Sequence, residues 1–569
     1  MVRVLMLSFL IGLLLLVMVG SCESNTIKVR SQQEFDALQE NLMQMIKAGE
    51  KNIKLVIYSG TYVAKEQQLT LKDIKAPNTK IRITGKNATI IPDGTTYQDG
   101  DTYQGTFSPD HSWMNSDQDV NIWSDVRYAD GLIEMLNAEK KTCRLKSKEP
   151  LPADIDIKNV YILIPHWFKS SVYKVDRITN GYIYFTATDL TAGYKKNYNV
   201  NDDNNYGKQD IRYKLCNVDA NRLRIANDKV QLPLGMTAVR DGHSQCFFQM
   251  QGCRLRSLEI TGLKFYGNSS EESKAALHFH KNNCEGITIS NCEFRGIRSI
   301  AISASSTDNL TVENCHFADC YLNALISDNN SGHTIVKNCT FNDMGKRMLN
   351  TPCVRCNGSD YLISGNRFND FGYCGIAVGV WYKHKKEHPC NGTVENNSLV
   401  YTDAYINNIA NSALMDGGAI YLWTKNDGAI IKNNYIHNYT GLKFNNGIYC
   451  DDGAYNFRII GNVITGISKG NCIDSRRVAR VEASSTPDSD IERANVNIVI
   501  KDNVVNGTIR FVGNEVVNNG CVKGENYIII TDPNSLPKMT YSNVLRVAED
   551  VWMDDNRKAK DKIKKSRKR

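Results

Sequence analysis

Two adjacent carboxylates stand at the end of a short alternating stretch, residues 447–456 (GIYCDDGAYN). The alternation predicts a strand that carries Tyr449 and Asp451 on the same face. Asp452 and a glycine turn follow directly. The apolar face of a sugar packs on an aromatic ring, and carboxylates do acid/base chemistry, so this stretch suits a saccharide site.

Other residues of the same kinds complete the candidate site. Asp416, Asp451, Asp452 and Asp474 are the candidate catalytic carboxylates. The candidate substrate-binding residues are aromatic or cationic, namely Arg355, Trp381, Tyr421, Trp423, Tyr449 and Arg476. The acids could instead only form turns, where Asp and Gly are favoured, or the acid pair could hold a structural calcium ion. We expect no other cofactor and no catalytic metal.

A repeated motif between about residues 250 and 511 indicates how these side chains are positioned. It places an aliphatic residue three positions before a Cys or Asn, with an apolar residue two positions after it, as in residues 289–294 (ISNCEF), 363–368 (ISGNRF) and 431–436 (IKNNYI). Successive copies begin 23 to 41 residues apart. This variable spacing argues against helical repeats and predicts a parallel β-helix, whose coils stack about 4.8 Å apart.

The Cys or Asn of the motif forms a column through the predicted coils. Cys292, Cys315 and Cys339 come first, and the later coils have Asn. We expect an Asn ladder, in which each side chain bonds the next coil and the turn backbone. The rung spacing exceeds the roughly 3.8 Å between the Cβ atoms of a disulfide, so we expect these Cys to be reduced and buried.

A second strand precedes the ladder in each coil and aligns the candidate residues. When its apolar pairs face inward, the outward column reads His278, Ser303, Ile326, Arg355, Ala377, Tyr421, Tyr449 and Asp474. Ala377 leaves a floor with little side chain, surrounded by aromatic and charged residues. In this alignment Asp451 faces Arg476, and Asp474 lies diagonal to Asp451 at about 7–8 Å.

The ladders, the coil spacing and residues 57–62 (IYSGTY) resemble the right-handed parallel β-helix proteins of the pectate-lyase-like superfamily. The resemblance covers roughly 50–93 and 236–511. It implies an all-β fold, a right-handed parallel β-helix solenoid. The apolar stripe of residues 31–48 adds an N-terminal capping helix, and the different texture of residues 94–235 adds an inserted β-rich module. Because that superfamily holds lyases, glycoside hydrolases, epimerases and adhesins, the resemblance is specific for the fold alone.

Within that superfamily the site is similar to the carboxylate-bearing coils of glycoside hydrolases, on residues 416–421 (DGGAIY) and 447–453 (GIYCDDG). The Gly-His-Gly and Arg-Ile-Lys motifs of polygalacturonase-type hydrolases are missing, which argues against a galacturonan substrate. We therefore expect a glycoside hydrolase that acts on a complex glycan. A polysaccharide lyase or epimerase acting on a uronate, or a non-catalytic glycan-binding protein, is the alternative.

The first residues have the pattern of an export signal. Residues 1–21 hold one charge, Arg3, and an apolar run, and small residues then precede Cys22. This end resembles the bacterial lipobox, which implies cleavage before Cys22 and a lipid on its sulfur. The chain would then be anchored in the envelope of a Gram-negative bacterium, at the outer-membrane surface or in the periplasm. An ordinary secretory signal is the alternative.

The rest of the chain divides into four predicted segments. Residues 22–93 hold a cap helix (31–48) and the first coils, 94–235 an inserted β-rich module, 236–520 the β-helix body with the site, and 521–569 a C-terminal segment with a basic tail. The net charge is +8, and much of it lies in that tail. The nearly neutral body argues against a nucleic-acid binder. We expect a monomer whose partners are a polysaccharide and, through the lipid on Cys22, the membrane.

Overall fold

A computed structural model describes the solenoid, the cap and the strands of the insert. The described ranges, with short gaps inside them, are 25–92, 246–268, 275–297, 300–379, 391–406, 417–475 and 498–511, together with the strands between 105 and 232 and residues 522–523 and 527–528. Among the described residues, no helix has the length and apolar character needed to cross a membrane.

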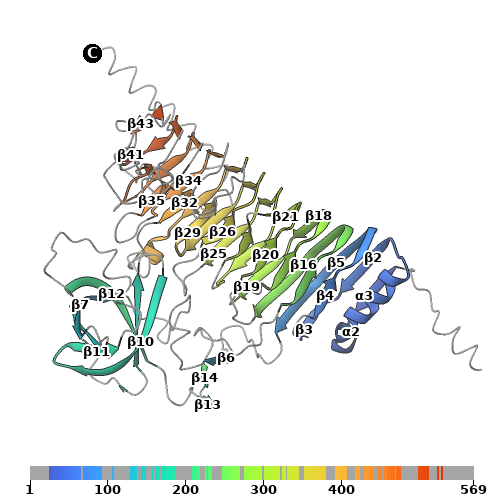
Figure 1. Cartoon of the computed structure of the whole chain (residues 1–569), viewed down its shortest axis with the longest axis horizontal. Coiled ribbons are helices and arrows are strands. Elements are labelled where there is room, and N and C mark those ends of the chain that lie inside the picture. Colours follow the sequence, from blue (N-terminus) through green and yellow to red (C-terminus); the bar gives the residue numbers. More distant parts are fainter. Residues whose placement is uncertain are drawn as a thin grey trace, which may run out of the picture.

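Two short helices cover the N-terminal end of the solenoid, α2 (Gln32–Asp36) and α3 (Leu38–Lys47). Ser31 caps the first helix: its hydroxyl accepts the Glu34 N–H, and the Glu34 carboxylate accepts the Ser31 N–H. Phe35, Leu38 and Leu42 are buried in the core cluster of the solenoid and close the open end of the first coil. Figure 1 shows this cap at the blue end of the stack.

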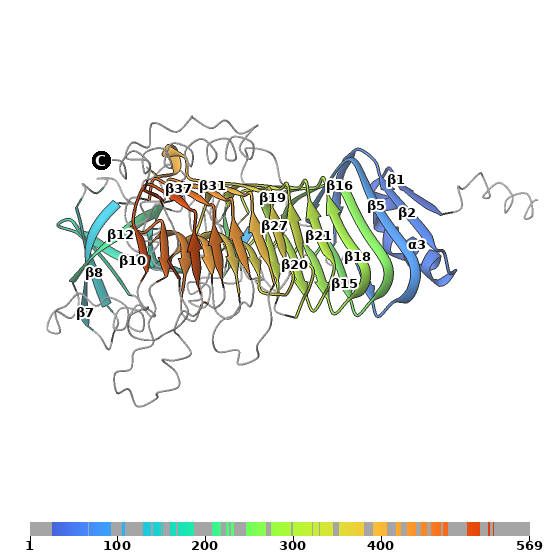
Figure 2. The same cartoon turned by 90° about the horizontal axis from the view of Figure 1, so that it is seen from above.

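The body of the molecule is a parallel β-helix, as the sequence predicts. Each coil has three parallel faces. One face is an eleven-stranded sheet. The other two faces are joined into one 23-stranded sheet, because the long strands β5 and β16 run through both of them. Figure 2 shows the coils side by side along one axis.

The eleven-stranded sheet consists of β4 (Leu69–Lys72), β15 (Phe248–Gln251), β17 (Leu277–His280), β20 (Ile302–Ser305), β23 (Leu325–Ser327), β26 (Pro352–Cys356), β29 (Cys374–Val378), β32 (Gly418–Leu422), β35 (Asn446–Cys450), β38 (Ile473–Ser475) and β41 (Ile509–Phe511). The second face consists of β1 (Thr26–Val29), β2 (Asn52–Ile57), β5 (Lys75–Pro92), β16 (Arg254–Asn268), β18 (Asn283–Ser290), β21 (Leu310–Glu313), β24 (Ile335–Lys337), β27 (Leu362–Ser364), β30 (Thr393–Glu395), β33 (Ile430–Lys432), β36 (Arg458–Ile460), β39 (Val499–Lys501) and β42 (Val522–Lys523). The third face consists of β3 (Gly60–Ala64), the later parts of β5 and β16, and then β19 (Glu293–Ile297), β22 (His316–Ala318), β25 (Thr340–Met344), β28 (Arg367–Phe371), β31 (Ser398–Val400), β34 (Tyr435–His437), β37 (Val463–Thr465), β40 (Val504–Val505) and β43 (Tyr527–Ile528).

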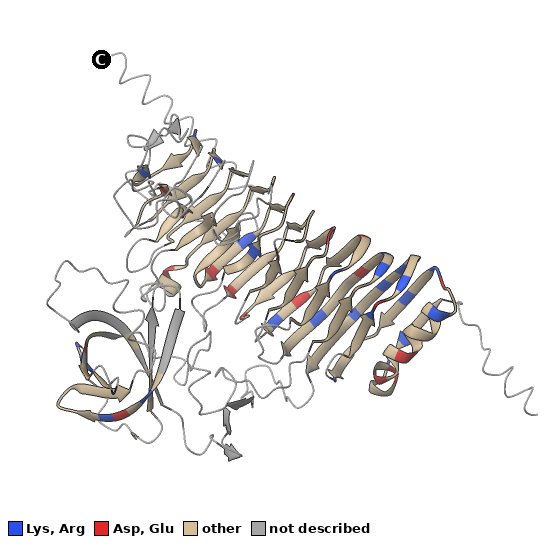
Figure 3. Cartoon of the chain, viewed as in Figure 1, with Lys and Arg blue, Asp and Glu red and all other residues tan. Residues whose placement is uncertain are grey.

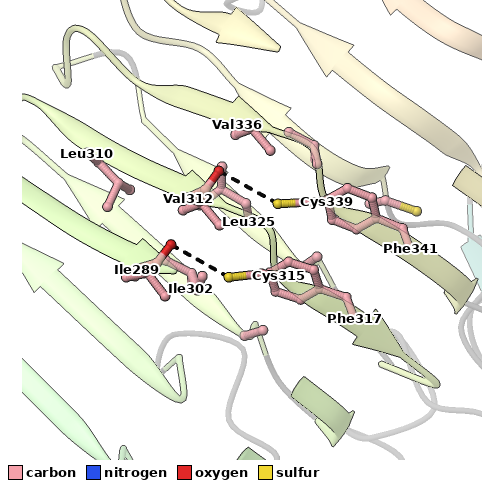
Figure 4. Packing of buried hydrophobic residues seen from close by; sticks show 14 of the residues in the cluster. Ile289, Ile302, Leu310, Val312, Cys315, Phe317, Leu325, Val336, Cys339 and Phe341 are labelled. Atoms are coloured by element: carbon pink, nitrogen blue, oxygen red, sulfur yellow. Dashed lines mark hydrogen bonds between the residues drawn. The ribbon is translucent and has the colours of Figure 1, made fainter. Parts of the chain in front are cut away.

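Stacks of like residues fill the interior of the solenoid. The rings of Phe294, Phe317, Phe341 and Phe368 lie nearly parallel, with centroids 4.4 to 4.9 Å apart. Beside them the thiols of Cys315 and Cys339 lie 3.6 Å from backbone carbonyl oxygens of the preceding coil (Figure 4). These Cys are buried and free, which confirms the prediction of reduced core thiols.

The predicted Asn ladder is also confirmed. Asn366, Asn397, Asn434, Asn462 and Asn503 are buried, and each Nδ2 of the first four donates to the Oδ1 of the next at 2.9 Å. The residue before each ladder position has a positive φ, which explains the Asn, Gly or Asp there, as at Asn396, Asn433 and Gly461. The ladder thus satisfies a left-handed turn that recurs in every coil.

The segment between the first and later coils forms a closed antiparallel barrel, in the strand order β10-β11-β8-β7-β12-β9. Its strands are β7 (Ala129–Asn137), β8 (Thr142–Ser147), β9 (Val160–His166), β10 (Lys169–Thr179), β11 (Tyr182–Thr186) and β12 (Lys208–Asn217), and β6 (Gly105–Phe107), β13 (Arg224–Ala226) and β14 (Lys229–Leu232) form a small separate sheet. In Figures 1 and 2 the barrel lies near the C-terminal coils.

Candidate functional site

The outward column that the sequence predicts is present in the eleven-stranded sheet, residue by residue. His278, Ser303, Ile326, Arg355, Ala377, Tyr421, Tyr449 and Asp474 are successive register partners. The column continues to Arg510, which pairs with Asp474. The inward neighbours belong to the solenoid core, whereas Ala377, Tyr421 and Tyr449 pack with Cys374 and Tyr373 in a separate cluster.

Asp451 is the carboxylate around which the described part of this column is organised. It directly follows β35, it is half-buried, and its backbone N–H donates to the Leu422 carbonyl of the preceding coil at 3.0 Å. The Tyr449 hydroxyl donates to Asp451 Oδ1 at 3.0 Å, and the Tyr421 hydroxyl donates to Asp451 Oδ2. Two donors from adjacent coils therefore fix the orientation of one carboxylate, in bonds that are stronger because the acceptor is charged.

The two tyrosine rings do not offer the open stacking faces that the sequence suggests. Tyr421 is 5% exposed and Tyr449 1% exposed. Their rings meet edge to face, with centroids 5.3 Å apart and an interplanar angle of 84°. Gly418 lies against Tyr449, where a Cβ would come 2.8 Å from the Tyr449 Cβ. In this structure the rings hold Asp451 in place, with their hydroxyls as the contacting groups.

Buried tyrosines that follow strands β31 and β34 of the third face position the bend that leads into this site; one of them, Tyr405, belongs to the short helix α5 (Asp403–Tyr405). The hydroxyls of Tyr405, Tyr401 and Tyr439 donate to three consecutive carbonyls, those of Phe371, Gly372 and Tyr373, at 2.6 to 2.9 Å. These carbonyls immediately precede β29, which carries Ala377. Burial raises the pKa of Tyr401 and of Tyr439 well above the usual value, so both hydroxyls stay protonated as donors.

Asp474 has a different environment from Asp451. Its carboxylate is fully buried and accepts from Arg510 Nε at 3.0 Å and from Nη2 at 2.7 Å. Asn471 Nδ2 lies 3.3 Å from the same carboxylate, and Asn471 also bonds Asn446. A bidentate ion pair of this kind orients the end of β38 and leaves Asp474 poorly placed to exchange a proton with a ligand.

Arg355 is the described cation nearest to the small floor at Ala377, its register partner. With the amide of Asn357 oriented to satisfy both its atoms, Asn357 Oδ1 accepts from Arg355 Nε and Nη2, both at 3.1 Å. Burial lowers the pKa of Arg355 from its usual value, because desolvation disfavours the charged form. The side chain is half-buried in this position.

The structure brings together five of the sequence-predicted site residues, Arg355, Tyr421, Tyr449, Asp451 and Asp474. The remaining ones lie outside the described residues: Asp416, Asp452, Trp381, Trp423, Arg476 and the lipidation residue Cys22. The predicted pair between Asp451 and Arg476 therefore stays a prediction. Among the described residues, no cluster of three or more His, Cys, Asp and Glu could hold a metal ion.

Sequence reasoning missed Arg510, although a signal for it was present. Residues 509–511 (IRF) repeat the spacing of the inward apolar pairs, and Ile509 pairs with Ile473 in register. Extending the alignment by one coil would have placed Arg510 beside Asp474.

Comparisons with known proteins agree with this architecture. Residues 241–413 match the family model described as a right handed beta helix region. A solved structure described as a glycoside hydrolase aligns with a TM-score of 0.53 at 12% identity, over 79% of this chain and 96% of that one.

Two further structures align less closely. A periplasmic alginate epimerase has a TM-score of 0.37 at 9% identity, over 84% of this chain and 76% of that one. A surface protein and adhesin of Streptococcus pneumoniae has a TM-score of 0.36 at 12% identity, over 85% of this chain and 99% of that one. No curated protein matches the sequence. The chain is therefore a right-handed parallel β-helix in its solenoid body, and its likeness to these proteins is one of fold.

Proposed function

We propose that this protein is a carbohydrate-active enzyme that processes a polysaccharide along the outer face of the eleven-stranded sheet. The observation that carries the proposal is the Asp451 carboxylate, half-buried and fixed by the Tyr421 and Tyr449 hydroxyls. The outward column from Arg355 to Arg510 covers six rungs, whose five spacings add up to about 24 Å at the usual strand separation. A surface of that length suits an extended chain of several sugar residues.

The reaction we favour is glycoside hydrolysis, with Asp451 as one carboxylate of the catalytic pair. Hydrolysis needs a second carboxylate about 5–9.5 Å from the first, with the smaller separations typical of retention of configuration and the larger ones of inversion. Because Asp474 forms a bidentate ion pair with Arg510, Asp416 and Asp452 are the better candidates for the second carboxylate. The likeness in fold to a structure described as a glycoside hydrolase supports this choice at the level of the scaffold.

Elimination or epimerisation at a uronate is the second candidate, and Arg355 is the observation that favours it. Such reactions need a cation to neutralise the uronate carboxylate and a base to remove the adjacent proton. Arg355 lies two rungs from Tyr421, whose hydroxyl contacts Asp451. The same face could therefore bind a uronate carboxylate at Arg355 while Asp451 acts on the ring.

Product analysis on a polysaccharide panel distinguishes these reactions. Hydrolysis releases new reducing ends without ultraviolet absorbance from an unsaturated product, and elimination releases both. Epimerisation changes the uronate composition without cleavage. We expect reducing ends alone; a chain that binds glycans but changes none of them across the panel would contradict an enzymatic role.

A further inference from the structure

Basic residues gather on the outside of the first coils, at the end of the molecule opposite the candidate site. Residues 26–92 hold eleven Lys and Arg against six Asp and Glu, whereas the whole chain has 69 against 61. In Figure 3 the Lys and Arg positions, drawn in blue, lie over β2, β5 and β16, next to the cap helices.

Five of these cations share the outward face of β1, β2 and β5 and the turns beside them. Lys28, Lys54 and Lys80 are exposed and point outward along their strands. Arg30 directly follows β1, and Lys86 lies inside β5, between the part that pairs with β2 and the part that pairs with β3. Within the described part of the chain none of the five forms an ion pair. We call this set the basic face.

The basic face keeps like charges next to each other. Lys54 and Arg82 are direct register partners on adjacent strands, an arrangement that is destabilising in the absence of an anion. Arg82 has an acidic partner, Glu259 at 2.7 Å, whereas Lys54 has none in the described chain. The fold therefore tolerates a local repulsion that a polyanionic surface would relieve.

An aromatic ring lies within the same face. The Tyr58 ring is half-buried, with the Arg30 guanidinium 4.6 Å and the Lys86 Nζ 5.1 Å from its centroid. Tyr, Lys and Arg with apolar stems and polar ends are the residue types that favour a membrane interface.

The position of the basic face identifies the anionic surface. Cys22, where the sequence predicts a lipid, is four residues from Thr26, the first residue of β1, so a fully extended chain spans at most about 14 Å. A lipid at Cys22 would therefore hold β1 close to the bilayer. The attraction between lysines and anionic headgroups acts over about one Debye length, about 8–10 Å, which is similar to this reach.

We propose that the basic face docks the N-terminal coils on the anionic headgroups of the membrane. This inference goes beyond the proposed function and does not depend on it. Docking through β1, β2 and β5 leaves the C-terminal coils, with Asp451 and its neighbours, as the part of the solenoid that reaches a polysaccharide.

Vesicle binding tests this proposal without the lipid. The chain from Glu23 onward is mixed with phosphatidylcholine vesicles, with or without phosphatidylglycerol, and the bound fraction is measured by sedimentation. We expect binding only to the anionic vesicles and loss of binding at high salt. The triple variant Lys28→Glu, Lys54→Glu and Lys80→Glu should bind at least roughly a hundredfold more weakly, since each lysine near such a surface contributes about a fivefold effect.

A matched control changes the net charge equally at the other end of the molecule. Lys174→Glu, Arg458→Glu and Lys501→Glu replace exposed cations of the barrel and the late coils. This control should bind vesicles nearly as well as the unmodified chain. Equal losses in the two triple variants, or no binding of the unmodified chain, would overturn the proposal.

A polyuronate competitor separates the membrane from a glycan partner. If the basic-face variant loses polyuronate binding while vesicle binding is unchanged, the face is a glycan site and the membrane proposal is wrong. Turnover of a soluble polysaccharide should be the same in both triple variants, so failure of docking and failure of the proposed function give different results.

Discussion

At the scale of single residues, the site depends on how one carboxylate is held. Asp451 accepts hydrogen bonds from the hydroxyls of Tyr421 and Tyr449, which are register partners on adjacent coils. This arrangement differs from a surface acid that merely follows a strand in a turn. The hydroxyls leave the carboxylate few rotamers, and preorganised charge of this kind is what acid/base catalysis requires.

Removing a single hydroxyl should lower turnover while leaving the fold intact. Tyr449→Phe and Tyr421→Phe each delete one hydrogen bond to a charged acceptor, worth about 1.5–3 kcal/mol. We expect kcat to fall roughly 10- to 100-fold in each variant, with a circular-dichroism spectrum like that of the unmodified protein. Tyr62→Phe is the control for loss of a buried tyrosine hydroxyl in the first coils, where this hydroxyl donates to the Tyr58 carbonyl, and it should lower stability more than turnover.

The ion pair between Asp474 and Arg510 should behave as a structural element. Arg510→Ala leaves the fully buried Asp474 carboxylate without its bidentate partner, and we expect a loss of about 3 kcal/mol in the free energy of unfolding. The double variant Asp474→Asn, Arg510→Met should recover part of that loss, because it removes the buried charge as well. A double variant less stable than Arg510→Ala would contradict this assignment, and chemical denaturation measures both.

At the scale of elements, the solenoid is specified by what recurs in each coil. A residue with positive φ precedes the ladder position, the ladder side chain satisfies the turn backbone, and a stacked ring fills the interior. Each device repeats at the strand spacing, so a substitution acts on two coils at once.

The Asn and Cys residues of the ladder should contribute differently to the free energy of unfolding. Asn434 donates to the Val394 carbonyl and to Asn462, and accepts from the Asn397 backbone and side chain. Asn434→Ala leaves several buried polar groups unsatisfied, at about 1–3 kcal/mol each. Cys315→Ala removes one thiol with weak hydrogen bonds, and we expect about 1 kcal/mol. Similar denaturation midpoints for the two variants would show that the ladder amides contribute little.

The coils and their register could be predicted from the sequence because their signals are local and repeated. The column from His278 to Asp474 follows from alternation and from the inward apolar pairs alone. The role of Tyr421 and Tyr449 could not be predicted in this way. Side-chain direction follows from the strand period, but whether a ring is open or buried depends on segments outside the strand.

The partner of Asp474 depends on a contact that is long-range in the chain. Asp474 bonds Arg510, which is 36 residues away, and the pairing follows from the sequence only when the alignment of the inward apolar pairs is extended by one coil to residues 509–511. The barrel shows the same limit, because its six strands close through antiparallel pairs between non-neighbouring segments, such as β7 with β12. The sequence predicts the strand content of that insert and leaves its topology open.

At the scale of the whole molecule, reduced thiols line the solenoid from early to late coils. Burial raises the pKa of Cys320 and of Cys472 from the usual 9.0 to about 12, and raises that of Cys292 and Cys315 well above 9.0. These thiols are therefore neutral and shielded near neutral pH.

This burial predicts how stability depends on alkaline pH. In the unfolded chain the thiols ionise near 9, whereas in the folded chain they stay protonated, so the stabilisation is complete below about pH 9 and is lost as the pH rises toward 12. The denaturant concentration at the unfolding midpoint should therefore be lower at pH 10 than at pH 8. A thiol reagent at pH 8 should react with the described Cys only after unfolding, and rapid reaction of the native chain would contradict their burial.

The central claim is that the outer face of the eleven-stranded sheet processes a glycan through Asp451. The most direct test compares Asp451→Asn with Asp328→Asn, because Asp328 follows an earlier strand of the same sheet and bonds Ser305 and the Ser306 N–H. On the polysaccharide that the unmodified protein converts, we expect Asp451→Asn to lose roughly 10²- to 10⁴-fold in kcat, while Asp328→Asn stays close to the unmodified rate. Full activity of a folded Asp451→Asn variant would contradict the claim.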